Sequence, residues 1–169
     1  MTTVRKVPIH VFKDDNEIGK RGEKIFSKYL DNLGLEHEDV SDVKEYQKQD
    51  IDFVVRAKTG QTWTVEVKND TRIAQTGNIF FETISNVHYS SNGCFNKTNA
   101  DAMVIVSESE KKLYIVTTKN LKKFVEDNKE HLKFRTTPGS NSAGFLVPVA
   151  SLGDKIKVKY APEVFQLKG

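Results

Sequence analysis

Two apolar runs constrain this chain more than any other feature, because only three residues separate them. The runs are IDFVVRA at 51–57 and QTWTVEVK at 61–68. Apolar and polar residues alternate along both, as they do in strands with one buried face. The connecting Lys58-Thr59-Gly60 offers a glycine where a three-residue hairpin loop needs a left-handed conformation. The pattern therefore predicts an antiparallel hairpin over residues 51–68.

The alternation also predicts the register of this hairpin. Pairing Val55 with Trp63 gathers the apolar side chains on one face, whereas a shift by one residue mixes the two faces. The same pairing puts Asp52 opposite Glu66, with Lys68 on the same face. Like charges directly opposite one another are destabilising. A shared proton, a nearby cation or a bound metal would offset the repulsion.

A third carboxylate is expected beside this pair. The segment IGKRGEKIFSKYLDNLG, residues 18–34, has apolar residues at helical spacing and follows the acidic cluster DDNE at 14–17, which is typical of a helix start. At about 100° per residue, Glu23 lies at the flank of the apolar stripe and Glu17 lies nearly opposite. We expect Glu23 to lean toward the sheet and Glu17 to face water.

The remaining patterns predict an α/β or α+β domain with a central mixed sheet flanked by helices. A second helix is expected from an N-cap at Thr118 to about Leu132. Residues 1–13 are predicted to form a strand or an arm, while 79–85 and the tail carry no clear pattern. Further strands are expected at 35–43 with a turn, 100–106, 112–118 and 144–149, the last strand, and a polar loop at 71–78.

Length and composition add broad limits. The 169 residues suit a single domain over 1–169, with a core at about 17–150 and a peripheral arm and tail. The lone cysteine, Cys94, excludes an intramolecular disulfide and fits a reducing compartment. No apolar run approaches the about 20 residues that span a bilayer, so we expect a cytoplasmic protein. A net charge of +3 is compatible with a polyanionic partner but carries little weight alone.

The acidic pair and the lysine form a motif, D-x13-E-x-K, from Asp52 to Lys68. This motif resembles that of the PD-(D/E)xK nuclease superfamily, whose members have a restriction-endonuclease-like core and usually carry a glutamate on a preceding helix, the position of Glu23. TGNIFFE at 76–82 and GCFNKTNADAMVIV at 93–106 look like segments of small phage and bacterial resolvase-like members. The likeness spans roughly residues 17–130. Cys94 and Phe95 depart from it where a tryptophan is common, and QKQD at 47–50 departs where a proline is frequent.

The resemblance implies metal-dependent hydrolysis of DNA phosphodiester bonds. Asp52 and Glu66 would hold Mg²⁺, for which Mn²⁺ could substitute, and Glu23 would be an accessory ligand. Lys68 would orient or help deprotonate the attacking water, or stabilise the charge that develops on the phosphate. Further candidates for the site are Glu82, Asp50, Gln75 and Asn78.

Several alternatives stay open at this point. The motif residues could form a solvated strand face with a surface ion pair, which contributes little. Within the nuclease hypothesis, the substrate could be branched or junction DNA in phage or prophage recombination or repair, cut by a homodimer with two sites. The chain could instead be a sequence-specific restriction-type endonuclease, or a catalytically inactive DNA-binding module on the same fold.

Overall fold

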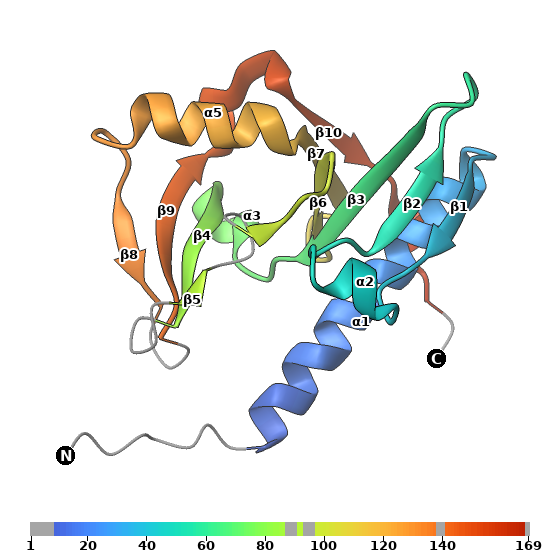
Figure 1. Ribbon diagram of the computed structural model, residues 1–169, viewed down its shortest axis with the longest axis horizontal. Helices are drawn as coiled ribbons and strands as arrows, with labels where there is room; N and C mark the ends of the chain where they lie inside the picture. The colour runs from blue at the N-terminus through green and yellow to red at the C-terminus, as the bar shows by residue number, and fades with distance from the viewer. Residues whose placement is uncertain (1–8, 87–90, 93–96, 138–140, 168–169) are drawn as a thin grey trace.

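The computed structural model describes residues 9–86, 91–92, 97–137 and 141–167 (Figure 1). A six-stranded sheet, here called the main sheet, runs through the centre in the order β1-β2-β3-β6-β7-β10. Strands β3 and β6 are parallel, and the other neighbours are antiparallel. The six strands are β1 (Glu36–Asp39), β2 (Phe53–Arg56), β3 (Thr62–Asn69), β6 (Ala102–Ser107), β7 (Lys112–Thr117) and β10 (Ile156–Tyr160). The expected α+β fold with a central mixed sheet flanked by helices is therefore confirmed.

A second, smaller sheet is antiparallel and has the order β5-β4-β9-β8. Its strands are β4 (Asn78–Asn86), β5 (Ser91–Asn92), β8 (Phe134–Thr136) and β9 (Ala143–Pro148). Strand β4 includes the segment 79–85 that carried no clear pattern in the sequence. Short helices complete the connections: α2 (Lys44–Gln47), α3 (Ile73–Thr76), α6 (Val149–Leu152), and the 3-10 turns η1 (Gly153–Lys155) and η2 (Pro162–Phe165).

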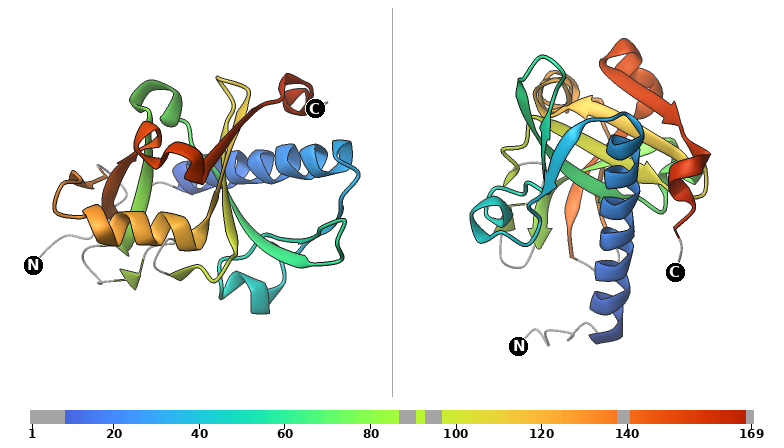
Figure 2. Two further views of the ribbon diagram at one scale, coloured as in Figure 1. Left: turned by 90° about the horizontal axis from the view of Figure 1, so that it is seen from above. Right: turned by 90° about the vertical axis from the view of Figure 1, so that its right-hand side faces the viewer.

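The two faces of the main sheet are covered differently. On one face lies the long helix α1 (Ile9–Asn32), whose buried Ile25, Phe26 and Leu30 pack on the sheet. On the other face lie the second sheet and α5 (Thr118–Asn128), which share a separate apolar core with β6 and β7. Figures 1 and 2 show this arrangement, with α1 and the second sheet on opposite sides.

Several predicted boundaries are wrong. Helix α1 begins at Ile9, so residues 9–13 are helical and not a strand or arm, and the acidic cluster at 14–17 lies inside the helix and not at its start. The rest of the predicted arm, residues 1–8, lies outside the described residues. The N-cap of α5 is Thr117, whose side chain accepts a hydrogen bond from the amide of Asn120, and α5 ends at Asn128. The loop expected at 71–78 contains α3.

The tail is also not peripheral. Strand β10 pairs with β7 along the edge of the main sheet, so 144–149 is not the last strand. Val164 of η2 is fully buried in the core under α1. The segment IKVKY alternates apolar residues with lysines, the pattern typical of a strand, although only Ile156 of β10 is buried. The core therefore extends well beyond residue 150.

Candidate functional site

The hairpin forms with the predicted register. Val55 faces Trp63 and Phe53 faces Val65 across β2 and β3. The turn closes through a 2.8 Å hydrogen bond from the amide of Ala57 to the carbonyl of Gln61, and Gly60 has a φ of 88°. The glycine is therefore needed for the backbone conformation that the loop adopts.

Asp52 lies just before β2 and deviates from the regular ladder. Its amide donates to the carbonyl of Val65 at 2.9 Å, while its Oδ2 accepts the amide of Val67 at 2.9 Å. Asp52 is thus not a ladder residue directly opposite Glu66, as the simple register predicted. The carboxylate instead occupies the point where β2 leaves β3, close enough to Glu66 for each carboxyl to affect the other's pKa.

Glu66 is the most unusual carboxylate among the described residues. It lies in the middle of β3 and only 6% of its surface is exposed. Its Oε1 lies 3.5 Å from Nζ of Lys68, and its buried Oε2 has no hydrogen-bond partner among the described residues. Burial raises the pKa of Glu66 to about 9. The negative charges of Asp52 and Asp50 also raise this pKa, whereas the positive charge of Lys68 lowers it. Burying a negatively charged carboxylate is energetically unfavourable. Glu66 therefore needs a bound proton or a nearby cation to neutralise its charge.

The solvated-face alternative is therefore wrong for Glu66. A surface ion pair requires both partners in water, and here only Lys68 reaches it, with 42% of its side chain exposed. Asp52 is partly buried, and burial also raises the pKa of its carboxyl. The two carboxylates form a desolvated acidic pair with one lysine at its edge.

Glu23 joins this group from α1. Burial raises its pKa to about 7, with further contributions from the charges of Asp52 and Asp39. The prediction that Glu23 leans toward the sheet is confirmed by these neighbours, and Glu17 is exposed as expected. Helix α1 therefore brings a third carboxyl group to the side of the pair.

Close packing at the end of β3 fixes the position of Glu23. The neighbouring Gly22 lies so close to Asn69 that a Cβ on the glycine would approach the Cβ of Asn69 to 2.9 Å. Asn69 donates through Nδ2 to the carbonyl of Ile18 at 2.9 Å and to Oε2 of Glu108 at 3.1 Å. Arg21 holds the same Glu108 carboxylate with two hydrogen bonds of 3.2 and 3.1 Å.

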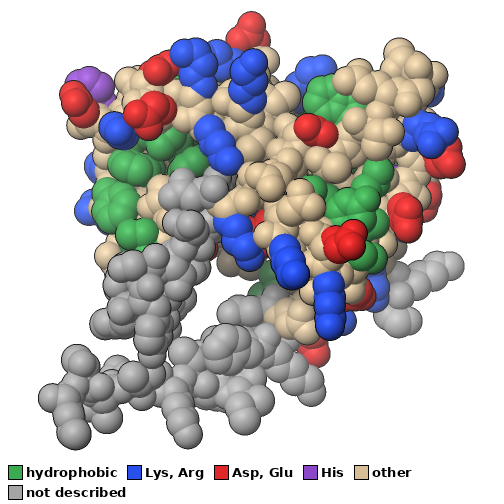
Figure 3. All heavy atoms as spheres, in the orientation of Figure 1, with side chains coloured by type: hydrophobic (Ala, Val, Ile, Leu, Met, Phe, Trp, Pro, Cys, Tyr) green, Lys and Arg blue, Asp and Glu red, His purple; other side chains and the backbone are tan. Residues whose placement is uncertain are grey.

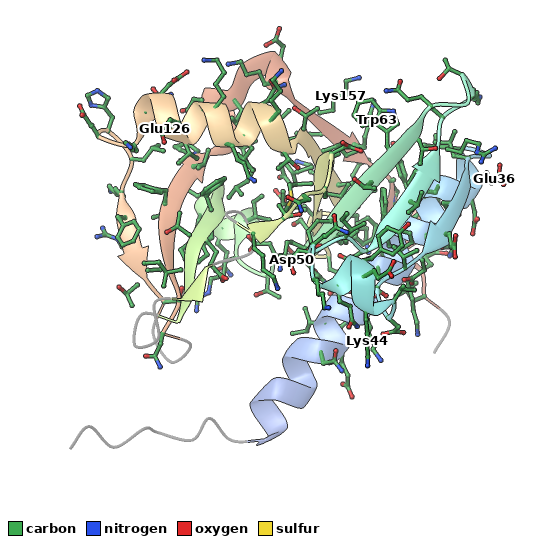
Figure 4. The ribbon with its side chains drawn as sticks, viewed as in Figure 1. Glu36, Lys44, Asp50, Trp63, Glu126 and Lys157 are labelled. Atoms are coloured by element: carbon green, nitrogen blue, oxygen red, sulfur yellow. The ribbon has the colours of Figure 1, made fainter. Side chains whose placement is uncertain are left out.

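Asp50 lies near the pair but has its own partner. Its Oδ1 lies 3.6 Å from Nζ of Lys97, and its backbone has a φ of 51°, which turns the chain into Ile51 (Figure 4). Its charge still contributes to the raised pKa of Glu66. Asp50 therefore lies next to the site, where it forms an ion pair with Lys97 and adds negative charge near Glu66.

A cavity of about 640 Å³ opens beside Lys68, between the end of β3 and the second sheet. Asn78 and Glu82 of β4 line it, whereas Asp52, Glu66 and Glu23 do not. Two arginines that the sequence did not single out also line it, Arg72 and Arg135. Arg135 lies on β8, more than sixty residues away along the chain, so no local pattern could place it here.

Gln75 is an exception among the candidates. It lies on α3, is exposed, and is not among the residues that line the cavity. Cys94 and Phe95 lie outside the described residues.

The described residues contain no group of three or more histidine, cysteine, aspartate or glutamate side chains already arranged around a metal position. Asp52 and Glu66 are a pair of carboxylates rather than such a group, and Oε2 of Glu66 is buried without a hydrogen bond to the described part of the chain. Mg²⁺ suits such a pair, because it commonly takes one or two protein carboxylates and keeps several waters.

Comparison with known proteins adds no relative: no family model, curated protein or solved structure matches the chain. Among the described helices, none combines the length and apolar character needed to cross a membrane.

Proposed function

We propose that this protein is a Mg²⁺-dependent endodeoxyribonuclease that hydrolyses phosphodiester bonds. One observation carries the proposal: a buried glutamate, Glu66, has an oxygen that no described residue hydrogen-bonds, beside a second carboxylate and a lysine. A fold tolerates this arrangement when a bound cation or a proton neutralises it. The D-x13-E-x-K motif that supplies these residues resembles that of PD-(D/E)xK nucleases.

Asp52 and Glu66 would hold Mg²⁺ or Mn²⁺, with Glu23 as an accessory ligand through water. A divalent ion bound there would polarise the scissile phosphate and lower the pKa of an attacking water. The hydrogen bond from Val67 keeps the Asp52 carboxylate in place, and Glu66 projects from β3, a strand paired with a neighbour on each side. The chain thus presents both ligands from rigid elements.

Lys68 supplies positive charge at the open side of the pair. Its Nζ lies 3.5 Å from Glu66 Oε1, and its partly exposed side chain also lines the cavity. From this position, the ammonium group orients the attacking water or stabilises the negative charge that grows on the phosphate during attack.

The DNA backbone would enter along the cavity. Arg72 and Arg135 lie on its walls and would contact phosphates, which is the usual role of arginine on a nucleic-acid surface. Lys and Arg side chains also gather down the middle of the face in Figure 3, although acidic side chains accompany them. The proposed substrate is branched or junction DNA in phage or prophage recombination or repair, cut by a homodimer.

The test is cleavage of branched, linear duplex and single-stranded DNA in Mg²⁺, Mn²⁺ or EDTA. Glu66→Gln and Lys68→Ala are compared with Glu126→Gln and Lys123→Ala, which change exposed residues of α5. We expect metal-dependent cutting, lost by roughly 100-fold or more in the two site variants, the effect of removing one group that stabilises a transition state.

Each outcome has a distinct meaning. Cutting that survives in EDTA or in Glu66→Gln contradicts the assignment of the site. Tight binding without cutting in any metal supports an inactive DNA-binding module. A fixed cut position on plain duplex supports a restriction-type enzyme.

A further inference from the structure

A second groove lies on the opposite face of the main sheet, away from the proposed active site. It has a volume of about 640 Å³ and is bounded by the C-terminal half of α1 on one side and by β10 on the other. In the right-hand view of Figure 2, α1 lies in front of the sheet and β10 lies to its right. Its floor is apolar and includes Val55, Trp63, Ala102 and Ile115.

Strand pairing explains this floor. Val104 pairs with Ile115, and Ile115 pairs with Lys157, so an apolar row crosses from β6 to β7 and ends on a lysine of β10. The neighbouring row ends the same way, with Leu113 opposite Lys159. Helix α1 covers only part of this face. A sheet face is ordinarily buried against another layer, and here part of it is open.

Large apolar side chains remain in water at the groove. Leu33 at the end of α1 is 45% exposed and Trp63 on β3 is 36% exposed, and both line it. Isolated exposed apolar residues are common on proteins. Here Trp63 belongs to a continuous apolar floor and Leu33 lies beside it, which is the arrangement found at interaction sites.

The rim of the groove is strongly basic. Lys58, Lys155, Lys157 and Lys159 line it, against one acidic residue, Asp154. Lysines on an edge strand prevent strand-to-strand association, which accounts for β10 but not for Lys58 in the hairpin turn. A partner that fills the apolar floor must therefore meet four positive charges and one negative charge.

We propose that this groove binds an acidic amphipathic helix of another protein. The apolar side of such a helix would lie on the floor beside α1, and its carboxylates would face the lysines, the mode of binding known for helices in grooves. A second copy of this chain is disfavoured, because two basic rims would repel one another. The apolar floor also fits a nucleic-acid backbone poorly, since that backbone is charged and hydrated.

The single tryptophan of the chain makes this testable by fluorescence, because Trp63 forms part of the floor (Figure 4). The full chain is titrated with a synthetic helical peptide that has leucines along one face and glutamates elsewhere. A second peptide keeps the leucines and replaces every glutamate with lysine. The variant Lys157→Glu/Lys159→Glu is compared with Lys123→Glu/Lys129→Glu, a matched double reversal on exposed residues in and just after α5.

We expect the acidic peptide to shift the emission of Trp63 and to bind about tenfold more tightly than the basic one, a difference of about 1.4 kcal/mol. The double reversal on β10 should remove this preference, and the control reversal should keep it. Equal affinity for both peptides, or no shift with the acidic peptide, overturns the proposal. The proposal is also overturned if the emission of Trp63 shifts when the protein concentration is raised, which would indicate self-association, or when DNA alone is added.

Discussion

The backbone amide of Val67 donates a 2.9 Å hydrogen bond to Oδ2 of Asp52. In a regular continuation of the β2–β3 register, this amide would face the carbonyl of Ile51. The side chain of Asp52 therefore takes the place of the main chain where β2 leaves β3. This substitution brings a carboxylate into the sheet next to Glu66.

The two roles of Asp52 can be separated by two substitutions. Asp52→Asn keeps an oxygen that accepts from Val67, whereas Asp52→Ala leaves this amide without a partner. We expect both to lose metal-dependent cleavage. Only Asp52→Ala should lower the free energy of unfolding, by about 1–3 kcal/mol, as measured by urea denaturation in EDTA. Equal destabilisation by both would mean that the charge, and not the hydrogen bond, holds the strand.

The raised pKa of Glu66 predicts how the free energy of unfolding depends on pH. The pKa of Glu66 is about 9 in the folded chain, against an ordinary value of 4.5, so between these values the folded state keeps a proton that the unfolded state has lost. The contribution of Glu66 to the stability of the metal-free protein should therefore be greatest below about pH 4.5. It should decrease as the pH rises toward 9. Glu23, with a pKa of about 7, acts in the same direction over a narrower range.

Thermal unfolding in EDTA between about pH 5 and pH 9 measures this effect. Glu66→Gln is neutral at every pH, so its Tm should fall less steeply than that of the wild type. Glu126→Gln, an exposed change on α5, should follow the wild-type curve. Parallel curves for all three proteins would contradict the assignment of the raised pKa to Glu66.

Metal binding should be coupled to the same proton. A ligand must be deprotonated to bind Mg²⁺, so below about pH 9 binding releases a proton from Glu66. We expect the affinity for Mg²⁺ to rise with pH by up to about tenfold per unit for one proton. Isothermal calorimetry in buffers of different ionisation enthalpy counts the protons. Binding that releases none, or that persists unchanged in Glu66→Gln, would place the ion elsewhere.

Two glycines of α1 form a matched pair for testing how Glu23 is positioned. A Cβ on Gly19 would meet no atom within 4 Å, whereas a Cβ on Gly22 would meet Asn69 at 2.9 Å. Gly19→Ala should stabilise the helix by about 0.5–1 kcal/mol. Gly22→Ala should destabilise by about 1–3 kcal/mol through overpacking and, by moving the adjacent Glu23, reduce cleavage. Denaturation and cleavage assays measure the two effects, and equal behaviour of the variants would show that α1 adjusts freely.

Local patterns in the sequence predicted the parts of the site that lie close together along the chain. Alternation and one glycine were enough for the hairpin and its register, so Glu66 and Lys68 followed directly. Helical spacing placed Glu23 on the flank that leans toward the sheet. These features depend on neighbours within a few residues, which a sequence records in its periodicity.

Only the tertiary structure decided what surrounds those residues. Glu66 is buried, and no described residue hydrogen-bonds its Oε2. Its neighbour in the sheet is Met103 of β6, which is distant in sequence. The same holds for Arg135 in the cavity and for β10, whose lysines end the apolar rows. The alternation within one strand indicates which of its faces is buried. It does not indicate which distant strand lies beside it, so these contacts depend on the tertiary structure.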